Sequence, residues 1–370
     1  MEILDVIFYI FCIVVAIQVI FYFFIFSRLA FFKPQTKAYN NLPVSVIICA
    51  KNEAENLKTF LPSIISQDYS TFEIVLINDA SSDDTFEVME QFAETNKNIK
   101  LVNVENYETF WGNKKFALTL GIKAAKYEHL LFTDADCKPI SNHWISEMAS
   151  HFVSNKSLVL GYGKYAYKEK SFLNKLIRFE TLITAINYFS FAKIGLPYMG
   201  VGRNLAYTKT EFFKANGFIN HMKLKSGDDD LFVNQVATKS NTSICLTPNS
   251  FTQSVPKSTF KAWFRQKRRH VSTAKHYKKL HKALLGFIYI TQILFWALSM
   301  LLLALLFKWQ IVVPLILLRL IGQYIIFGNS AKTLNEKGLT ALTPILEIFL
   351  IVVQLTIFIN NLISKPNYWK

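Results

Sequence analysis

The stretch of sequence that decides the fold is HLLFTDAD, residues 129–136. An apolar run of strand length ends there in two carboxylates, Asp134 and Asp136, which are separated by one residue. Hard divalent cations prefer oxygen ligands, and a bound Mg²⁺ or Mn²⁺ can neutralise a diphosphate as it leaves. An Asp-x-Asp pair alone is common and most often belongs to a solvated loop. Its place at the end of a predicted strand, after three more strand-and-helix units, makes this pair a candidate metal site.

The residues around this stretch alternate between strand-like and helix-like patterns. Short β-branched runs predict strands at residues 44–49, 72–78, 99–104 and 129–133. Helical spacing of apolar residues predicts helices at residues 53–66, 84–95 and 114–126. This alternation is typical of an α/β domain with a mainly parallel sheet, in which ligands collect at the carboxyl ends of the strands. We therefore expect the polar residues that follow these strands to meet in one site.

Four long apolar segments predict transmembrane helices. One lies before the α/β domain, and three lie after it: residues 6–26, 283–307, 311–328 and 339–361. Acidic residues precede the first segment and basic residues follow it, which places the amino terminus outside and the α/β domain in the cytoplasm. A cleaved signal peptide is the alternative for the first segment, but the start of a signal peptide should be basic. We expect an integral membrane protein.

The composition agrees with a membrane protein. The chain of 370 residues is 51% hydrophobic and 15% aromatic, with a formal net charge of +15. Residues 261–282 hold nine Lys or Arg and no acidic residue, and they precede an apolar segment, so they should face anionic headgroups or phosphate. That position argues against nucleic-acid binding. The four cysteines are scattered without metal-ligand spacing and are predicted to be free thiols.

Two features of the apolar segments leave alternatives open. Residues 171–196 carry apolar side chains at helical spacing, and the helix could face the core or lie in the membrane interface. Arg319 and Glu347 lie within the last two apolar segments, where an unpaired charge is costly. A structural pair between them is the favoured interpretation, and a transport path is the alternative.

Polar segments follow the first two predicted strands. They read KNEAEN, residues 51–56, and NDASSDDT, residues 78–85. Their side chains could hydrogen-bond a base or a ribose. Ser82 and Asp83 are good helix N-cap residues, so capping is the alternative interpretation. Asp79 precedes the cap, and capping alone does not explain it.

Together, these segments resemble glycosyltransferase family 2, the inverting enzymes with a GT-A fold, over residues 44–270. The resemblance implies a nucleotide-sugar donor and a divalent metal, Mg²⁺ or Mn²⁺. The metal would be held by Asp134 and Asp136. The donor-binding residues that the resemblance implies are Ala50, Asn52, Glu53, Asp79, Lys114 and Asp134.

The assignment of Lys114 comes from the family's Gly-Lys-x-x-Ala-Leu pattern. It resembles GNKKFAL, residues 112–118, with one extra residue after the glycine. Lys114 keeps the spacing to the alanine and the leucine and so inherits the role. Lys115 stays open as the alternative.

The resemblance also implies a general base. The segment SGDDDL, residues 226–231, resembles the family's Glu-Asp-x-Asp-Leu element, whose first aspartate deprotonates the acceptor hydroxyl. Alignment gives that role to Asp228, while Gly227 replaces the common glutamate and Asp229 stays a competitor. Mutual repulsion of adjacent carboxylates should raise at least one pKa. The alternative is an acidic helix amino terminus. The preceding segment GVGRNLA, residues 200–206, resembles the family's approach to the acceptor site.

The segment QKRRH, residues 266–270, resembles the Gln-x-x-Arg-Trp motif of processive and lipid-acting members. The resemblance places Gln266 and Arg269 in the catalytic site, where Arg269 would stabilise the leaving diphosphate. His270 stands where tryptophan is usual, which weakens the case for a processive polymerase. The alternative is that the cluster only anchors the chain to the membrane surface.

These expectations combine into one organisation. It consists of a transmembrane anchor at residues 1–27, a GT-A catalytic domain at 42–257, a basic interfacial helix at 258–282 and transmembrane helices at 283–370. The expected function is transfer of a sugar from a nucleotide donor, most simply a UDP-sugar, to a lipid or lipid-linked acceptor at the cytoplasmic face. The alternatives are a processive polysaccharide synthase, assembled as an oligomer or with a partner protein, and a transporter or membrane scaffold.

Overall fold

The computed structural model describes residues 2–34, 41–105, 114–224 and 226–364. The chain divides into two compact units. The helical unit consists of Met1–Lys33, Lys170–Ile194 and Tyr277–Lys365. The α/β unit consists of Pro34–Glu169, Gly195–His276 and Pro366–Lys370.

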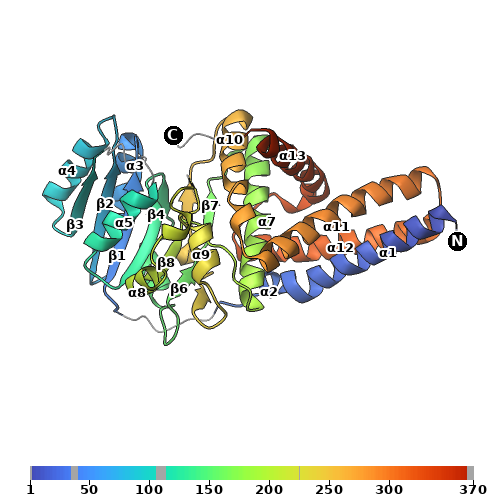
Figure 1. Cartoon of the computed structure of the whole chain (residues 1–370), viewed down its shortest axis with the longest axis horizontal. Helices are drawn as coiled ribbons and strands as arrows, with labels where there is room; N and C mark the ends of the chain where they lie inside the picture. The colour runs from blue at the N-terminus through green and yellow to red at the C-terminus, as the bar shows by residue number, and fades with distance from the viewer. Residues whose placement is uncertain (1, 35–40, 106–113, 225, 365–370) are drawn as a thin grey trace. The chain divides into compact units, whose positions relative to one another are not determined.

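A seven-stranded sheet forms the centre of the α/β unit, with the strand order β3-β2-β1-β4-β8-β6-β9 (Figure 1). The strands are β1 (Val44–Ala50), β2 (Phe72–Asp79), β3 (Ile99–Val104), β4 (His129–Asp134), β6 (Leu158–Leu160), β8 (Leu205–Thr208) and β9 (Thr242–Ile244). Strand β8 runs antiparallel to β4 and β6, and the other neighbouring strands are parallel. The predicted α/β domain with a mainly parallel sheet is therefore confirmed.

Helices cover both faces of this sheet. The helices of the unit are α3 (Ala54–Ile65), α4 (Thr85–Thr95), α5 (Lys114–Ala124), α6 (Trp144–Ala149), α8 (Lys209–Lys214), α9 (Asp230–Val236) and α10 (Phe260–Val271). Helices α3, α4 and α6 share one apolar core with β1 and β2. Helix α5 packs on the opposite face, so closely that a Cβ atom at Gly121 would lie 2.1 Å from Ile77 Cδ1. This packing fixes the amino terminus of α5 at the carboxyl edge of the sheet.

A second, three-stranded sheet begins directly after the Asp-x-Asp turn. It has the order β5-β10-β7, with β5 (Cys137–Pro139), β10 (Thr252–Ser254) and β7 (Gly163–Tyr165). The turn between β4 and β5 therefore joins the two sheets, and both of them support its side chains.

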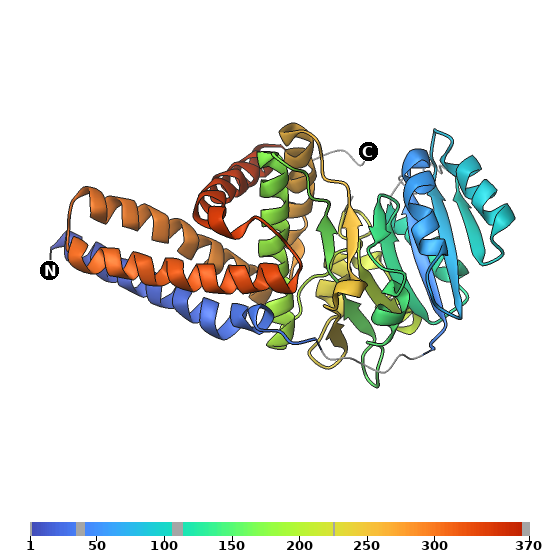
Figure 2. The same ribbon diagram turned by 180° about the vertical axis from the view of Figure 1, so that it is seen from behind.

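The helical unit contains α1 (Ile3–Ile20), the π-helix η1 (Phe21–Phe26), α2 (Ser27–Ala30), α7 (Phe172–Lys193), α11 (Lys279–Ala304), α12 (Trp309–Thr333) and α13 (Thr343–Ile363). Among the described residues, four helices are long and apolar enough to cross a membrane: Ile3–Ala30, Lys279–Ala304, Trp309–Thr333 and Thr340–Ile363. Helices α1, α11 and α12 lie side by side in both views (Figures 1 and 2). One such helix before the α/β residues and three after them match the prediction.

A buried ion pair joins α12 and α13. Arg319 Nη2 lies 2.6 Å from Glu347 Oε1, and both side chains are almost fully excluded from solvent. Arg319 Nε also donates to Gln18 Oε1 at 2.7 Å, and Trp296 Nε1 donates to Glu347 Oε2 at 3.0 Å. The predicted pair is confirmed.

Helix α7 belongs to the helical unit, although it lies between two parts of the α/β unit in the sequence. It packs against α2, η1, α12 and α13. Its Arg178 forms a buried ion pair with Glu336 at 2.5 Å. The helix is core-facing, but the core is that of the apolar helices. The predicted continuous catalytic domain over residues 42–257 therefore differs from the α/β unit, which omits residues 170–194.

Candidate active site

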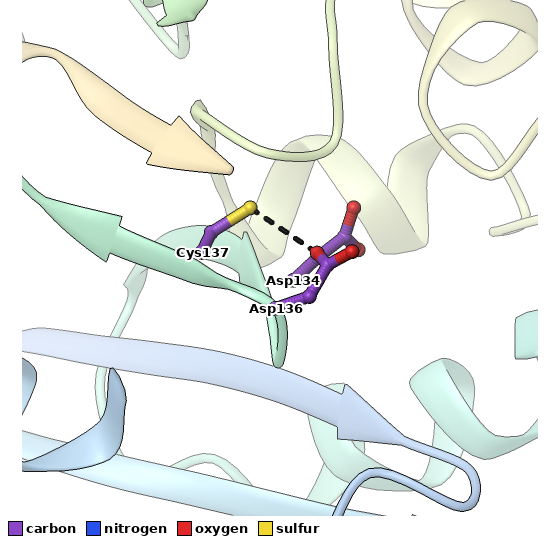
Figure 3. Close-up of side chains that lie close together, drawn as sticks. All are labelled: Asp134, Asp136 and Cys137. Carbon is purple, nitrogen blue, oxygen red and sulfur yellow. Dashed lines mark hydrogen bonds between the residues drawn. The ribbon is translucent and has the colours of Figure 1, made fainter. Parts of the chain in front are cut away.

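The Asp-x-Asp turn presents two carboxylates at the end of β4. Asp134 is the last residue of β4 and pairs in register with Cys49 of β1, and Asp136 lies in the turn that leads to β5. One potential ligand atom from each of Asp134, Asp136 and Cys137 falls within 4.8 Å of the others (Figure 3). The carboxylates point toward the same space, as the predicted metal site requires.

Cys137 differs from the two aspartates in its chemistry. Its Sγ donates to Asp136 Oδ1 at 3.5 Å (Figure 3). It also forms a hydrogen bond with Ser254 Oγ at 2.9 Å. Burial, together with the charges of Asp136 and Asp134, raises the pKa of the Cys137 thiol well above its ordinary value. A neutral thiol is a poor ligand for a hard cation. The oxygens of Asp134 and Asp136 therefore fit Mg²⁺ or Mn²⁺, and Cys137 supports the turn.

Lys114 lies between the Asp-x-Asp turn and the acidic triplet. Its Nζ is 2.9 Å from Asp134 Oδ1 and 3.0 Å from Asp228 Oδ2. Burial alone would lower the pKa of Lys114, but the two carboxylates outweigh it and hold the pKa well above its ordinary value. The Lys114 ammonium therefore bridges Asp134, a predicted metal ligand, and Asp228, the predicted general base.

Lys115 points elsewhere. Its Nζ donates to the backbone carbonyls of His221, Leu224 and Ser226 at 2.8, 2.8 and 2.6 Å. The side chain holds the loop that leads to the acidic triplet. Of the two candidate lysines, Lys114 is the one beside the aspartates; the glycine of the predicted pattern, at residue 112, lies outside the described residues.

The three aspartates of the triplet have different partners. Asp228 faces Lys114. Asp229 accepts from the backbone N–H groups of Gly202 and Asp230, at 2.7 Å each, and caps α9. Asp230 accepts through Oδ2 from the hydroxyl of Thr273. The acidic helix amino terminus and the candidate base are thus both present, on neighbouring residues.

The local backbone conformation explains why glycine, rather than the usual glutamate, occupies position 227. Gly227 has φ +98°, a backbone conformation that residues other than glycine rarely adopt. A Cβ atom there would lie 2.4 Å from Leu231 Cδ1. The chain turns at Gly227 to direct Asp228 toward Lys114, and a glutamate would not fit this backbone.

The pKa values of Asp228 and Asp229 shift in opposite directions. Burial raises the pKa of Asp228, but the charge and hydrogen bond of Lys114, a backbone hydrogen bond and the Lys115 charge together lower it below its ordinary value. Burial, followed by the charges of Asp228 and Asp230, raises the pKa of Asp229 to about 7. The expected repulsion therefore raises the pKa of Asp229, whose two oxygens are occupied by backbone N–H groups. Asp228 is the ionised carboxylate beside the Asp-x-Asp turn.

The segments after β1 and β2 hold each other in place. The backbone N–H of Asn52 donates to Ser81 Oγ at 3.0 Å, and Asn52 Oδ1 accepts from the N–H of Ser82 at 2.8 Å. Glu53 donates from its N–H to Thr85 Oγ1 at 2.8 Å, and Ala50 is buried at the end of β1. The side-chain oxygen of Asn52 is thus used within the protein.

Asp79 is the exception among these residues. Its side chain is 3% exposed, and among the described residues its Oδ2 atom has no hydrogen-bond partner. Burial raises its pKa. A buried acceptor without a donor is costly, and a ligand N–H or O–H would satisfy it. The N-cap residue of α4 is Asp84, which makes no side-chain cap hydrogen bond, and the carboxylate of Asp83 accepts from the N–H of Thr85 at 3.1 Å.

Gln266 and Arg269 lie three residues apart on α10 and therefore on one side of that helix. Both are half-buried, and Gln266 Oε1 has no hydrogen-bond partner among the described residues. The hydroxyl of Thr273, just after α10, donates to Asp230. This contact ties the end of α10 to the acidic triplet.

Arg203 is a candidate that sequence reasoning missed. Its Nη1 donates to the carbonyl of Lys164 at 3.1 Å and to Ser254 Oγ at 3.0 Å, and its guanidinium lies 4.2 Å from the Tyr165 ring centroid. Burial and the charge of Asp134 raise the pKa of Asp136, and the charge of Arg203 offsets part of this rise. The available signal was an arginine inside the segment GVGRNLA, which was interpreted only for its small residues.

Residues 45–222 match the model of the family described as Glycosyl transferase family 2. The chain therefore contains a glycosyltransferase family 2 domain, and its α/β unit has the GT-A fold of such enzymes. A mannosyltransferase from Pyrobaculum calidifontis, solved with GDP-Man and Mn²⁺, has a similar fold with a TM-score of 0.60. It is 18% identical, and the match covers 91% of this chain and all of that chain.

Two curated relatives show similarity over part of their length. A poly-beta-1,6-N-acetyl-D-glucosamine synthase from Staphylococcus epidermidis is 36% identical over 121 residues, which are 32% of this chain and 28% of the relative. A UDP-Glc:alpha-D-GlcNAc-diphosphoundecaprenol beta-1,3-glucosyltransferase from Escherichia coli is 27% identical over 133 residues, which are 35% of this chain and 48% of the relative. The chain thus matches less than half the length of either relative.

Proposed function

We propose that this protein is an inverting, metal-dependent glycosyltransferase that moves a sugar from a nucleotide-sugar donor to a lipid or lipid-linked acceptor at the cytoplasmic face of a membrane. One observation carries the proposal. Lys114 brings Asp228 and the Asp-x-Asp residue Asp134 together at the carboxyl edge of the GT-A sheet, in a chain whose described residues include four helices long and apolar enough to span a membrane.

The donor would lie along the carboxyl ends of β1, β2 and β4. Asp79 Oδ2, which has no hydrogen-bond partner in the part of the chain that the structure describes, would accept a hydrogen bond from the base or the ribose. Asp134 and Asp136 would hold Mg²⁺ or Mn²⁺. When bound, the metal supplies positive charge that offsets the charge of the leaving diphosphate. Arg269 and Gln266 are proposed to face the same diphosphate, where a guanidinium would act as a second fixed positive charge.

Asp228 is the proposed general base. It would take the proton of the acceptor hydroxyl while that oxygen forms a bond to the anomeric carbon. The bond from the anomeric carbon to the diphosphate oxygen breaks on the opposite face, so the configuration inverts and the nucleoside diphosphate leaves. Asp228 is suited to this role because Lys114 favours its ionised form at neutral pH.

Two observations support the proposal of a lipid or lipid-linked acceptor: the apolar helices and the similarity to one relative. The relative from Escherichia coli acts, by its name, on a diphosphoundecaprenol-linked sugar with UDP-Glc as donor. A UDP-sugar and a lipid-linked acceptor are therefore the first substrates to test. The cytoplasmic orientation is proposed from the basic residues that flank the α/β residues. Assembly as an oligomer or with a partner protein stays a prediction.

The second candidate is a processive polysaccharide synthase of the same family. It is favoured by the similarity to the poly-beta-1,6-N-acetyl-D-glucosamine synthase. His270 in place of the usual tryptophan argues for a single transfer.

Product length distinguishes the two candidates. Detergent-purified protein is incubated with a panel of nucleotide sugars, Mg²⁺ or Mn²⁺ and membrane lipid extract, and the products are analysed by mass spectrometry. One added sugar per lipid supports lipid glycosylation, whereas a ladder of products supports the synthase. Absence of any nucleotide release would refute both.

A further inference from the structure

We propose that Lys114 is a positioning residue for the general base Asp228, rather than a ligand of the donor. This inference rests on the proposed function. The family resemblance assigned Lys114 to donor binding, but its contacts in the structure indicate a different role.

Both contacts of the ammonium with carboxylates are short. Nζ lies 2.9 Å from Asp134 Oδ1 and 3.0 Å from Asp228 Oδ2. The side chain of Lys114 is 14% exposed, and that of Asp228 is 12% exposed. Solvent screens such pairs weakly, so the two ion pairs hold the Asp228 carboxylate in one orientation relative to the Asp-x-Asp turn.

Little free space surrounds the Asp228 carboxylate. A cavity of about 20 Å³, lined by Lys114, Asp134 and Asp228 among others, has room for about one water molecule. The backbone before Asp228 is held separately, because Lys115 binds the carbonyls of residues 221, 224 and 226. Loss of Lys114 should therefore free the Asp228 side chain without releasing the loop.

If Lys114 bound the donor, its ammonium would have to contact the donor diphosphate. Two carboxylates already compensate the charge of Lys114, so a donor diphosphate would have to compete with both of them. The carboxylates belong to Asp134, at the end of β4, and Asp228, two residues before the start of α9. Removal of the ammonium should therefore impair proton transfer more than donor binding.

The test compares Lys114→Gln with Lys123→Gln, the same change at an exposed position on the same helix α5. We measure kcat for sugar transfer and, separately, Kd for the nucleotide donor by equilibrium binding in the presence of metal. Lys114→Gln should lower kcat on the order of 100-fold, the size of a general-base contribution, while Kd changes by less than about threefold. Lys114→Arg should recover part of kcat, and Lys123→Gln should match the wild type.

A double variant tests whether Lys114 acts through the base. In an Asp228→Asn background, Lys114→Gln should cause little further loss of kcat, because the residue that it positions is already inactive. Equal thermal midpoints for Lys114→Gln and the wild type exclude a folding defect.

Two results would overturn the inference while leaving the proposed function intact. They are an unchanged kcat in Lys114→Gln, and a rise in donor Kd that accounts for the whole loss of kcat/KM. Absence of transfer by the wild type with every donor would instead refute the proposed function and this inference together.

Discussion

Asp229 Oδ2 accepts a hydrogen bond of 2.7 Å from the backbone N–H of Gly202. This bond joins the acidic triplet to the segment predicted to approach the acceptor. There is little space between the two residues, because a Cβ atom at Gly202 would lie 3.3 Å from the same oxygen. With its other oxygen on the N–H of Asp230, Asp229 acts as an anchor for the backbone, and Asp228 is the carboxylate directed at Lys114.

Asp229→Asn should therefore retain sugar transfer to within about tenfold of the wild type. The amide keeps one acceptor oxygen but leaves one buried N–H without a partner, which should lower the free energy of unfolding by about 1–3 kcal/mol. Initial rates and thermal unfolding in detergent check both effects. A loss of kcat with a normal thermal midpoint would instead identify Asp229 as the base.

Lys115→Met should destabilise the α/β unit. The change removes a buried ammonium and leaves three backbone carbonyls without their donor, so the free energy of unfolding should fall by about 3 kcal/mol or more. The matched control is Lys123→Met, at an exposed position on the same helix. Equal thermal midpoints for the two variants would show that the three hydrogen bonds contribute little.

Metal removal should stop transfer. Chelation of divalent cations should abolish activity, and Mg²⁺ or Mn²⁺ should restore it, because Asp134 and Asp136 offer the oxygen ligands that these ions prefer. Asp136→Asn should require a higher metal concentration for half-maximal rate. Cys137→Ser should not, because the thiol is a hydrogen-bond donor to the turn. Full activity in chelator would exclude a metal at this site.

Arg319→Met should destabilise the helical unit, because it leaves Glu347 as an uncompensated buried charge. Breaking one partner of a buried pair costs about 3–5 kcal/mol, whereas replacing both partners with apolar residues is often neutral. The thermal midpoint in detergent should therefore fall in Arg319→Met and recover in Arg319→Met with Glu347→Leu. A double variant as unstable as the single one would show that the pair itself stabilises the unit.

The first four strands could be predicted closely from the sequence. Residues 44–49, 72–78, 99–104 and 129–133 were expected, and β1 to β4 end at most one residue beyond these ranges. Strands β1, β2 and β4 are mostly buried and therefore appear in the sequence as nearly continuous apolar runs, which allowed their prediction. Strands β5 to β10 have three or four residues, too few to show a period, and they were not predicted.

The partners of the site residues could not be read from the sequence. The spacing of Lys114 and Lys115 left both open, because neighbouring helix residues differ by about 100° in direction and only the packing of α5 decides which one faces the aspartates. The membership of α7 in the helical unit likewise depends on tertiary contacts, such as that of Arg178 with Glu336. Arg203 was missed for the same reason, since its neighbours come from distant segments.

The measurement that tests the central claim most directly is nucleotide release by purified wild type and Asp228→Asn, with donor, divalent metal and lipid acceptor. We predict that release depends on the acceptor in the wild type and falls by about 10²–10⁴-fold in Asp228→Asn, while donor binding and the thermal midpoint stay near the wild-type values. Undiminished release in Asp228→Asn would contradict the account, because the carboxylate that Lys114 holds beside Asp134 would then not be the base.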